Sequence, residues 1–148
     1  MTPAKSIVVA TDFSEIADNA TAYAVDLARR LGAKVTFLHA YEIPVYSFFD
    51  GSLVATADLA ASIASASAGS MEALLTKYKG SGVAVDGVVR VGPPAEEVQR
   101  VAEEVKAELI VVGTHGRRGL ARALLGSVAE VVVRTSSRPV VVVPFPRT

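Results

Sequence analysis

Two pairs of small residues have the types and spacing expected of an anion-binding site. Gly113 and Gly116 directly follow the apolar run 109–112, and Gly126-Ser127 comes after nine further residues. Glycines at the end of a strand let backbone N–H groups turn toward a ligand without interference from a Cβ atom. Ser127 begins a helical pattern, and the N–H groups at the start of a helix attract anions. This spacing therefore predicts a phosphate-binding site.

The same residues also have an ordinary structural interpretation. A glycine after a strand is common in turns. Ser127 and Glu130 have the spacing of a capping box, in which the serine hydroxyl accepts the N–H of Glu130. The loop between the two pairs carries Arg117, Arg118 and Arg122, which can either screen a triphosphate or form a solvated surface. Because the loop has no acidic residue, we favour the first role for the arginines.

Apolar runs alternate with helical patterns along the chain, and this order predicts the elements that position the site. The predicted strands are residues 6–10, 34–40, 83–91, 109–112 and 140–143. Ser14 is suited to begin the first helix and Gly32 to end it, while Pro93-Pro94 opens the third. The apolar stripe predicted for the first helix comprises Ile16, Ala20, Tyr23, Ala24, Leu27 and Leu31. The alternation predicts a single α/β domain over residues 1–148, with a five-stranded parallel sheet.

The segment between the second strand and the second helix is less regular. We expect Tyr46, Phe48 and Phe49 to lie in a loop, which can form a partner surface, cover a bound ligand as a lid or pack on the second helix. We favour packing on the helix. That helix is predicted to end near Tyr78, and Gly69 leaves the position of its start open.

The composition excludes several classes of function. Fifteen basic residues balance 15 acidic ones among the 148 residues, which argues against a general nucleic-acid-binding protein. The chain has no cysteine, so it has neither a disulfide framework nor a cysteine metal site. Since no stretch reaches the ~18 apolar residues needed to span a bilayer and no signal peptide is evident, we expect a cytoplasmic protein without a membrane anchor.

Asp12, His39 and His115 are the other candidates for chemistry. Ligands of open α/β sheets bind at the carboxyl ends of strands, and Asp12 follows the first strand as Gly113 follows the fourth. Asp12 can bind a ribose hydroxyl or a phosphate-bound Mg²⁺, or it can simply cap the turn into the first helix. His115 has no partner that the sequence assigns, so a role in acid–base catalysis is not supported. His39, at the end of a buried strand, is expected to be a satisfied core residue.

The segment from Gly113 to Glu130 resembles the nucleotide-binding signature of the universal stress protein family, G-x2-G-x9-G-[ST]. The resemblance extends over the whole chain. It includes residues 7–14 in and after the first strand, 38–40 in the second strand, 92–97 before the third helix, and Arg138-Pro139 before the last strand. One departure is Pro93, which stands where many relatives carry a polar residue, so a polar contact from that turn is in doubt.

The resemblance implies a fold and a set of ligand contacts. The implied strand order is 3-2-1-4-5 with helices on both faces, as in the adenine-nucleotide α-hydrolase-like group. The implied contacts with the nucleotide are Ala10, Asp12, Ala40, Val112, Gly113, Gly116, Gly126, Ser127 and Val128. The cofactors implied are ATP and Mg²⁺, with Asp12 as the residue nearest the metal.

The resemblance implies a stress-response protein that binds ATP and acts as a signalling or protective homodimer. The last strand, Val140 to Val143, is expected to be a sheet edge that pairs with a second copy, unless loops or the tail Pro146-Arg147-Thr148 cover it. A slow ATPase or nucleotidyl-transfer enzyme is the alternative, although the chain has no P-loop motif and no evident catalytic base. A phospho-acceptor receiver domain is excluded, because Arg90-Val91-Gly92 stands where an acidic acceptor is required.

Overall fold

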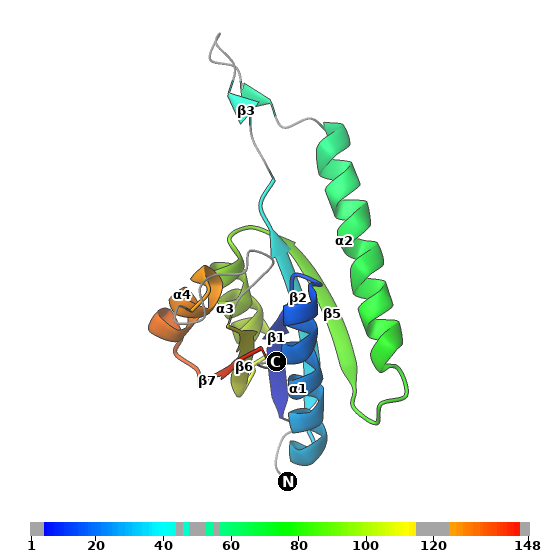
Figure 1. The fold of residues 1–148 in the computed structure, drawn as a ribbon, viewed down its shortest axis with the longest axis vertical. Coiled ribbons are helices and arrows are strands. Elements are labelled where there is room, and N and C mark those ends of the chain that lie inside the picture. The colour runs from blue at the N-terminus through cyan, green and yellow to red at the C-terminus, as the bar shows by residue number, and fades with distance from the viewer. Residues whose placement is uncertain (1–4, 44–45, 48–52, 55–56, 115–124, 146–148) are drawn as a thin grey trace.

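A computed structural model describes residues 5–43, 46–47, 53–54, 57–114 and 125–145 (Figure 1). Its elements, in chain order, are β1 (Ser6–Ala10), α1 (Glu15–Leu31), β2 (Lys34–Tyr41), β3 (Tyr46–Ser47), β4 (Leu53–Val54), α2 (Ala57–Tyr78), β5 (Val85–Val91), α3 (Pro94–Glu104), β6 (Leu109–Gly113), α4 (Ser127–Thr135) and β7 (Val140–Val143).

The main sheet has five parallel strands in the order β5-β2-β1-β6-β7. Counted along the chain without the short β3 and β4, this is the predicted order 3-2-1-4-5, so the predicted fold is confirmed. β1 lies at the centre, where Val8 stands opposite Thr36 of β2 and Ile110 of β6. The carboxyl ends of β1 and β6 are therefore neighbours, as a shared ligand site requires.

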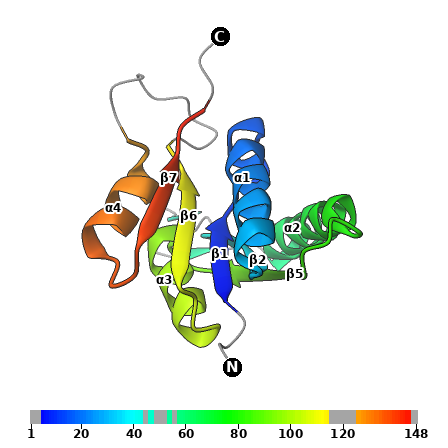
Figure 2. The same cartoon turned by 90° about the horizontal axis from the view of Figure 1, so that it is seen from below.

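Helices cover both faces of the sheet, and alternate residues of β1 point to different layers. Ile7 and Val9 pack with α1 and α2, whereas Val8 packs with α3 and α4. Figure 2 shows α1 and α2 on one side of the strands and α3 and α4 on the other. Because both faces are covered, β1 is a continuous apolar run rather than an alternating one.

The first helix begins and ends where the sequence predicts. The Ser14 hydroxyl accepts the backbone N–H of Ala17 at 3.2 Å, and Gly32 ends the helix in a left-handed conformation with φ +66°. Two residues of the predicted apolar stripe are nevertheless outside the core, since Tyr23 is 46% exposed and Leu31 is 39% exposed. The buried residues of α1 are Ala17, Ala20, Thr21, Ala24, Val25 and Ala28, so the buried face is turned relative to the predicted stripe.

The segment between β2 and β5 differs from its prediction in three ways. The expected loop contains a two-stranded antiparallel ribbon, in which Tyr46 pairs with Val54. Gly69 lies inside α2, which extends past the end of the main sheet (Figure 1). β5 begins at Val85 rather than at Val83, because Val83 donates its N–H to the Ser81 hydroxyl at 3.3 Å and belongs to the preceding turn.

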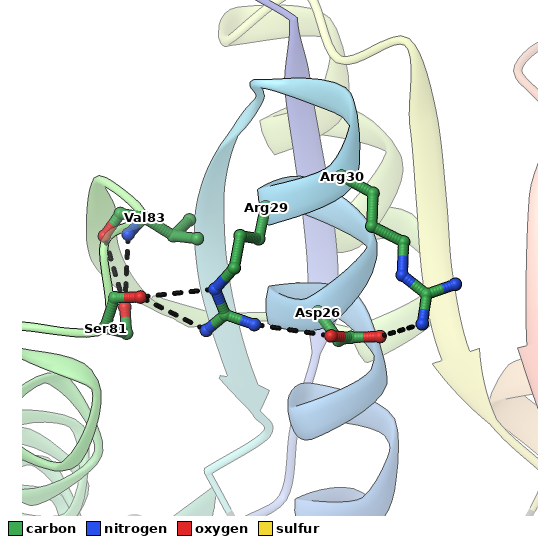
Figure 3. Close-up of polar contacts among 5 residues, drawn as sticks. All are labelled: Asp26, Arg29, Arg30, Ser81 and Val83. Atoms are coloured by element: carbon green, nitrogen blue, oxygen red, sulfur yellow. Dashed lines mark hydrogen bonds and ion pairs between the residues drawn. The ribbon is translucent and has the colours of Figure 1, made fainter.

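A polar network fixes the amino-terminal edge of the sheet, opposite the predicted site (Figure 3). Arg29 near the end of α1 donates from Nε and Nη2 to the Ser81 carbonyl oxygen, at 3.3 and 3.2 Å. Asp26 accepts from Arg29 at 3.3 Å and pairs with Arg30 at 2.9 Å. These contacts join α1 to the turn before β5 and leave the carboxyl-terminal edge to be shaped by other residues.

Candidate functional site

The turn after β1 holds Asp12 in a defined position. Asp12 Oδ1 accepts the backbone N–H of Ser14 at 3.0 Å and its hydroxyl at 2.5 Å. Phe13 has φ +64°, a left-handed conformation that is rare for a bulky side chain. The Thr11 hydroxyl accepts the N–H of Phe13 at 2.9 Å. Asp12 thus has the structural role considered above, and its carboxylate lies half-buried directly after the central strand.

β2 contributes His39 and Ala40 beside this turn. His39 Nδ1 lies 2.9 Å from the carbonyl oxygen of Thr11. A carbonyl oxygen only accepts, so Nδ1 carries a proton and donates it. The imidazole also packs against the ring of Phe13, with 4.5 Å between centroids, and against that of Tyr41 at 5.8 Å. The prediction of a satisfied histidine is confirmed, although the ring is half-buried at the sheet edge and not in the central core.

The two halves of the glycine signature meet at Thr114. Gly113, the last residue of β6, pairs with Val143 of β7, and the next residue, Thr114, donates its N–H to the Val143 carbonyl oxygen at 3.2 Å. The Thr114 carbonyl oxygen in turn accepts the N–H of Gly126. The buried Gly126 has φ −63° and ψ 156°, which any residue adopts. Its local backbone therefore does not by itself require glycine.

The start of α4 corrects one prediction. The N-cap residue is Gly126, no side chain of the described residues caps the helix, and Ser127 is the first helical residue. The N–H of Glu130 donates to the carbonyl oxygen of Gly126 at 2.9 Å, so the Ser127–Glu130 capping box is wrong. The reason is that Ser127 lies one position past the cap. Its exposed hydroxyl stands beside first-turn N–H groups that have no acceptor within the described part of the chain.

Eight of the nine predicted contact residues are described, and the topology places them along one edge. Ala10, Asp12 and Ala40 follow or end the central strands, Val112 and Gly113 end β6, and Gly126, Ser127 and Val128 begin α4. Val112 is 2% exposed, so almost none of its surface, backbone or side chain, is open to a ligand in this structure. Gly116, His115, the loop arginines, Phe48 and Phe49 lie outside the described residues.

The contributions of Thr114 and His39 could not be predicted from the sequence. Thr114 occupies a variable position of the signature, and its role comes from two backbone bonds that no side-chain type reveals. His39 acts on Thr11, a residue 28 positions away in the chain. Only the pairing of β1 with β2 brings these two residues together.

Arg90 near this edge is paired with a carboxylate of α3. Arg90, opposite Ala40 in the sheet, forms an ion pair with Glu104 of α3. The hydrogen bond to Glu104 raises the pKa of Arg90 above its ordinary value, and the nearby charges of Glu104 and Glu97 act in the same direction, against a smaller desolvation effect. Arg90 therefore keeps its charge at all physiological pH values, and that charge is engaged by α3.

The described residues do not contain a preformed metal cage. No three His, Asp or Glu side chains among them gather closely enough to hold a metal ion. A single carboxylate such as Asp12 is nevertheless suited to Mg²⁺, which commonly takes one or two protein carboxylates together with phosphate oxygens and water. Within the same part of the chain, no helix is long and apolar enough to cross a membrane.

Comparison with known proteins identifies the family of proteins that has this fold and this candidate site. Residues 3–144 match the model of the Universal stress protein family, so the chain belongs to that family. It is 32% identical over 145 residues to universal stress protein MJ0531 of Methanocaldococcus jannaschii, a match that covers 97% of this chain and 84% of the relative.

Solved structures agree with this assignment. The structure of MJ0577, also from M. jannaschii, superposes with a TM-score of 0.80 at 27% identity, covering 99% of this chain and 100% of that one. A universal stress protein in complex with cAMP superposes with a TM-score of 0.68 at 28% identity, covering 98% and 100% of the two chains.

Proposed function

We propose that this protein binds ATP together with Mg²⁺ at the carboxyl edge of the sheet. The observation that carries the proposal is the start of α4. Its first-turn N–H groups have no side-chain cap in the described part of the chain, and they lie beside the exposed Ser127 hydroxyl. The bond from Gly126 to Thr114 ties this helix start to the end of β6. Such a helix start attracts the negative charge of phosphate. A related protein of known structure binds cAMP, which supports an adenine nucleotide as the ligand class.

Each part of the edge has a proposed role. The backbone N–H groups of Ser127 and Val128, with the Ser127 hydroxyl, donate to phosphate oxygens, and Gly113 and Gly116 let the backbone approach them. Asp12 binds the ribose or the phosphate-bound Mg²⁺. The adenine ring lies against the chain near Ala10, Ala40 and Val112. The bound Mg²⁺ neutralises phosphate charge.

Binding, rather than catalysis, is the proposed activity, with turnover absent or very slow. A slow ATPase or nucleotidyl-transfer enzyme is the second candidate. His39, the histidine in the described part of the chain, donates from Nδ1 to a backbone carbonyl and packs between two rings, which does not favour it as a mobile base. Phosphate release near the typical ~10 s⁻¹ of enzymes would overturn the proposal that the protein binds ATP without catalysis.

We further propose that the protein acts as a stress-response homodimer through β7. This strand ends the main sheet, and it bonds to β6 through its odd-numbered residues, since Ile110 and Thr114 donate to Pro139 and Val143. The N–H groups of Val140 and Val142 therefore face away from β6, toward the open edge. Pairing two edges around a twofold axis satisfies these groups in both copies.

Mass spectrometry of protein purified without added nucleotide tests the ligand directly. We expect an adenine nucleotide to co-purify with the parent chain and to be lost in Gly126→Val prepared in the same way. If the parent carries no adenine nucleotide and Mg-ATP does not raise its melting temperature, the proposed function is wrong.

A further inference from the structure

We propose that His39 is a positioning residue: it fixes the strained turn that carries Asp12, and acts through the backbone carbonyl of Thr11. The effect on the turn is independent of the ligand. Its consequence for nucleotide affinity rests on the function proposed above.

The turn needs support from outside its own four residues. Phe13 adopts φ +64°, a region in which the Cβ of an L-residue crowds the backbone. Such a conformation persists only where surrounding contacts over-determine it. The bonds from Phe13 to Thr11, and from Ser14 to Asp12, are local to the turn.

β2 supplies the support, because it bonds both sides of Thr11. The Thr11 N–H donates to the Leu38 carbonyl oxygen at 2.8 Å, as a continuation of the parallel ladder. The Thr11 carbonyl oxygen accepts from His39 Nδ1 at 2.9 Å. Thr11 is 7% exposed, so water has little access to replace this bond.

His39 also contacts the residue on the other side of Asp12. Its ring packs on the ring of Phe13 at 4.5 Å between centroids, and Tyr41 lies beyond it at 5.8 Å. One side chain thus touches Thr11 and Phe13, the two neighbours of Asp12 in the chain. A donor at the Nδ1 position and a ring against Phe13 together determine where the Asp12 carboxylate lies.

A pair of variants with nearly the same shape separates the hydrogen bond from the packing. In His39→Asn, the amide nitrogen occupies the position of Nδ1 and donates, whereas His39→Leu has similar branching and no donor. We expect the affinity for Mg-ATP to fall about fivefold further in His39→Leu than in His39→Asn, the ratio that corresponds to one lost hydrogen bond. Rescue by Asn would not occur if the residue merely filled space.

Nuclear magnetic resonance supplies a readout that needs no nucleotide. In the parent chain, the imidazole ¹⁵N shifts should identify the tautomer with the proton on Nδ1. The amide resonances of Phe13 and Ser14 should move in both variants, because both lose the ring, and should move further in His39→Leu, which also loses the donor. If Mg-ATP does not bind the parent chain, the proposed function is wrong. The resonances still test whether His39 fixes the turn, because they are measured without nucleotide. A proton on Nε2 alone, or identical behaviour of the two variants, would overturn it.

Discussion

Gly126 donates its backbone N–H to the carbonyl oxygen of Thr114, so the residue that precedes α4 is bonded to the residue that follows β6. Thr114 is itself tied to β7 through its N–H. The position of the α4 N-terminus is therefore set by the main sheet, although nine residues, 117–125, separate the two halves of the signature in sequence. A ligand bound at this edge would contact both halves.

Substitutions in the second half of the signature should weaken nucleotide binding in a fixed order. Gly126→Val should be worst, because a branched side chain is placed on a buried residue where phosphate must approach the backbone. Ser127→Ala should be intermediate, with a loss of about 1–3 kcal/mol of binding free energy from one charge-assisted bond. His115→Ala should be mildest. Isothermal titration with Mg-ATP measures all three.

Circular dichroism establishes that each of these variants is folded, and Ser137→Ala provides a matched control. Ser137 is exposed in the turn before β7, at the opposite edge of the sheet. Since Ser127 does not cap α4, Ser127→Ala should leave the free energy of unfolding within about 0.5 kcal/mol of the parent. A folded Gly126→Val protein that binds ATP like the parent would show that the nucleotide site is misplaced.

Asp12→Asn should separate the structural role of Asp12 from its charge. The amide oxygen of Asn can still accept from Ser14, so we expect the turn to remain formed. The loss of negative charge should weaken binding of Mg-ATP by about 1–3 kcal/mol. It should also reduce the difference between the ATP affinity measured with Mg²⁺ and the ATP affinity measured with EDTA. An unchanged dependence on Mg²⁺ would argue against a metal contact at Asp12.

Gly92→Ala should destabilise the fold by about 1–3 kcal/mol. Gly92 has φ +154°, and an added Cβ would lie 2.8 Å from Oε1 of Glu97. That carboxylate cannot move away freely, because Glu97 is 4% exposed and pairs with Arg100 at 2.5 Å. Urea unfolding measures the change.

Gly69→Ala is the matched comparison for Gly92→Ala. Gly69 is exposed inside α2, and an added Cβ would have no neighbour within 4 Å. Alanine is favoured over glycine in a helix, so this variant should be more stable by about 0.5–1 kcal/mol. Equal changes in the free energy of unfolding for the two substitutions would contradict the predicted clash between a Cβ at position 92 and Glu97.

Val142→Pro should disrupt the proposed dimer without breaking the sheet. The N–H of Val142 faces the open edge of β7, so proline removes a donor to a second copy and none to β6. Sedimentation should give a monomer for Val142→Pro and a dimer for the parent and for Val142→Thr, which keeps the N–H. A parent chain that sediments at 15.4 kDa at high micromolar concentration would remove the dimer proposal.

The sequence predicts this fold well wherever local signals and burial agree. β1 and β7 have the bounds expected from their apolar runs, and α4 begins at Ser127, as its helical pattern predicts. The central position of β1 produces its apolar run, and Ser14 and Gly32 cap α1 through their own chemistry. Sequence patterns predict helix position and burial less well where contacts between elements decide them. Gly69 is tolerated inside α2, and Tyr23 and Leu31 lie outside the core despite their spacing.

The candidate site was predicted as a set of positions, and its internal contacts were not. Residue types at strand ends indicate which edge binds a ligand, because parallel strands end together. They do not indicate that Gly126 rather than Ser127 caps α4, since the two differ by one position in the turn. They also do not reveal the bond from His39 to Thr11, which depends on the pairing of two strands.

Titration of ¹⁵N-labelled protein with Mg-ATP tests the central claim most directly, because it locates the ligand on the chain. We predict micromolar affinity, on the order of −8 kcal/mol. The largest amide shift changes should occur at the carboxyl edge, in Asp12, Ala40, Gly113 and residues 126–128. The amides around Ser81 at the opposite edge should stay in place. Shift changes confined to that opposite edge, or none at millimolar Mg-ATP, would contradict a nucleotide site at the ends of β1 and β6.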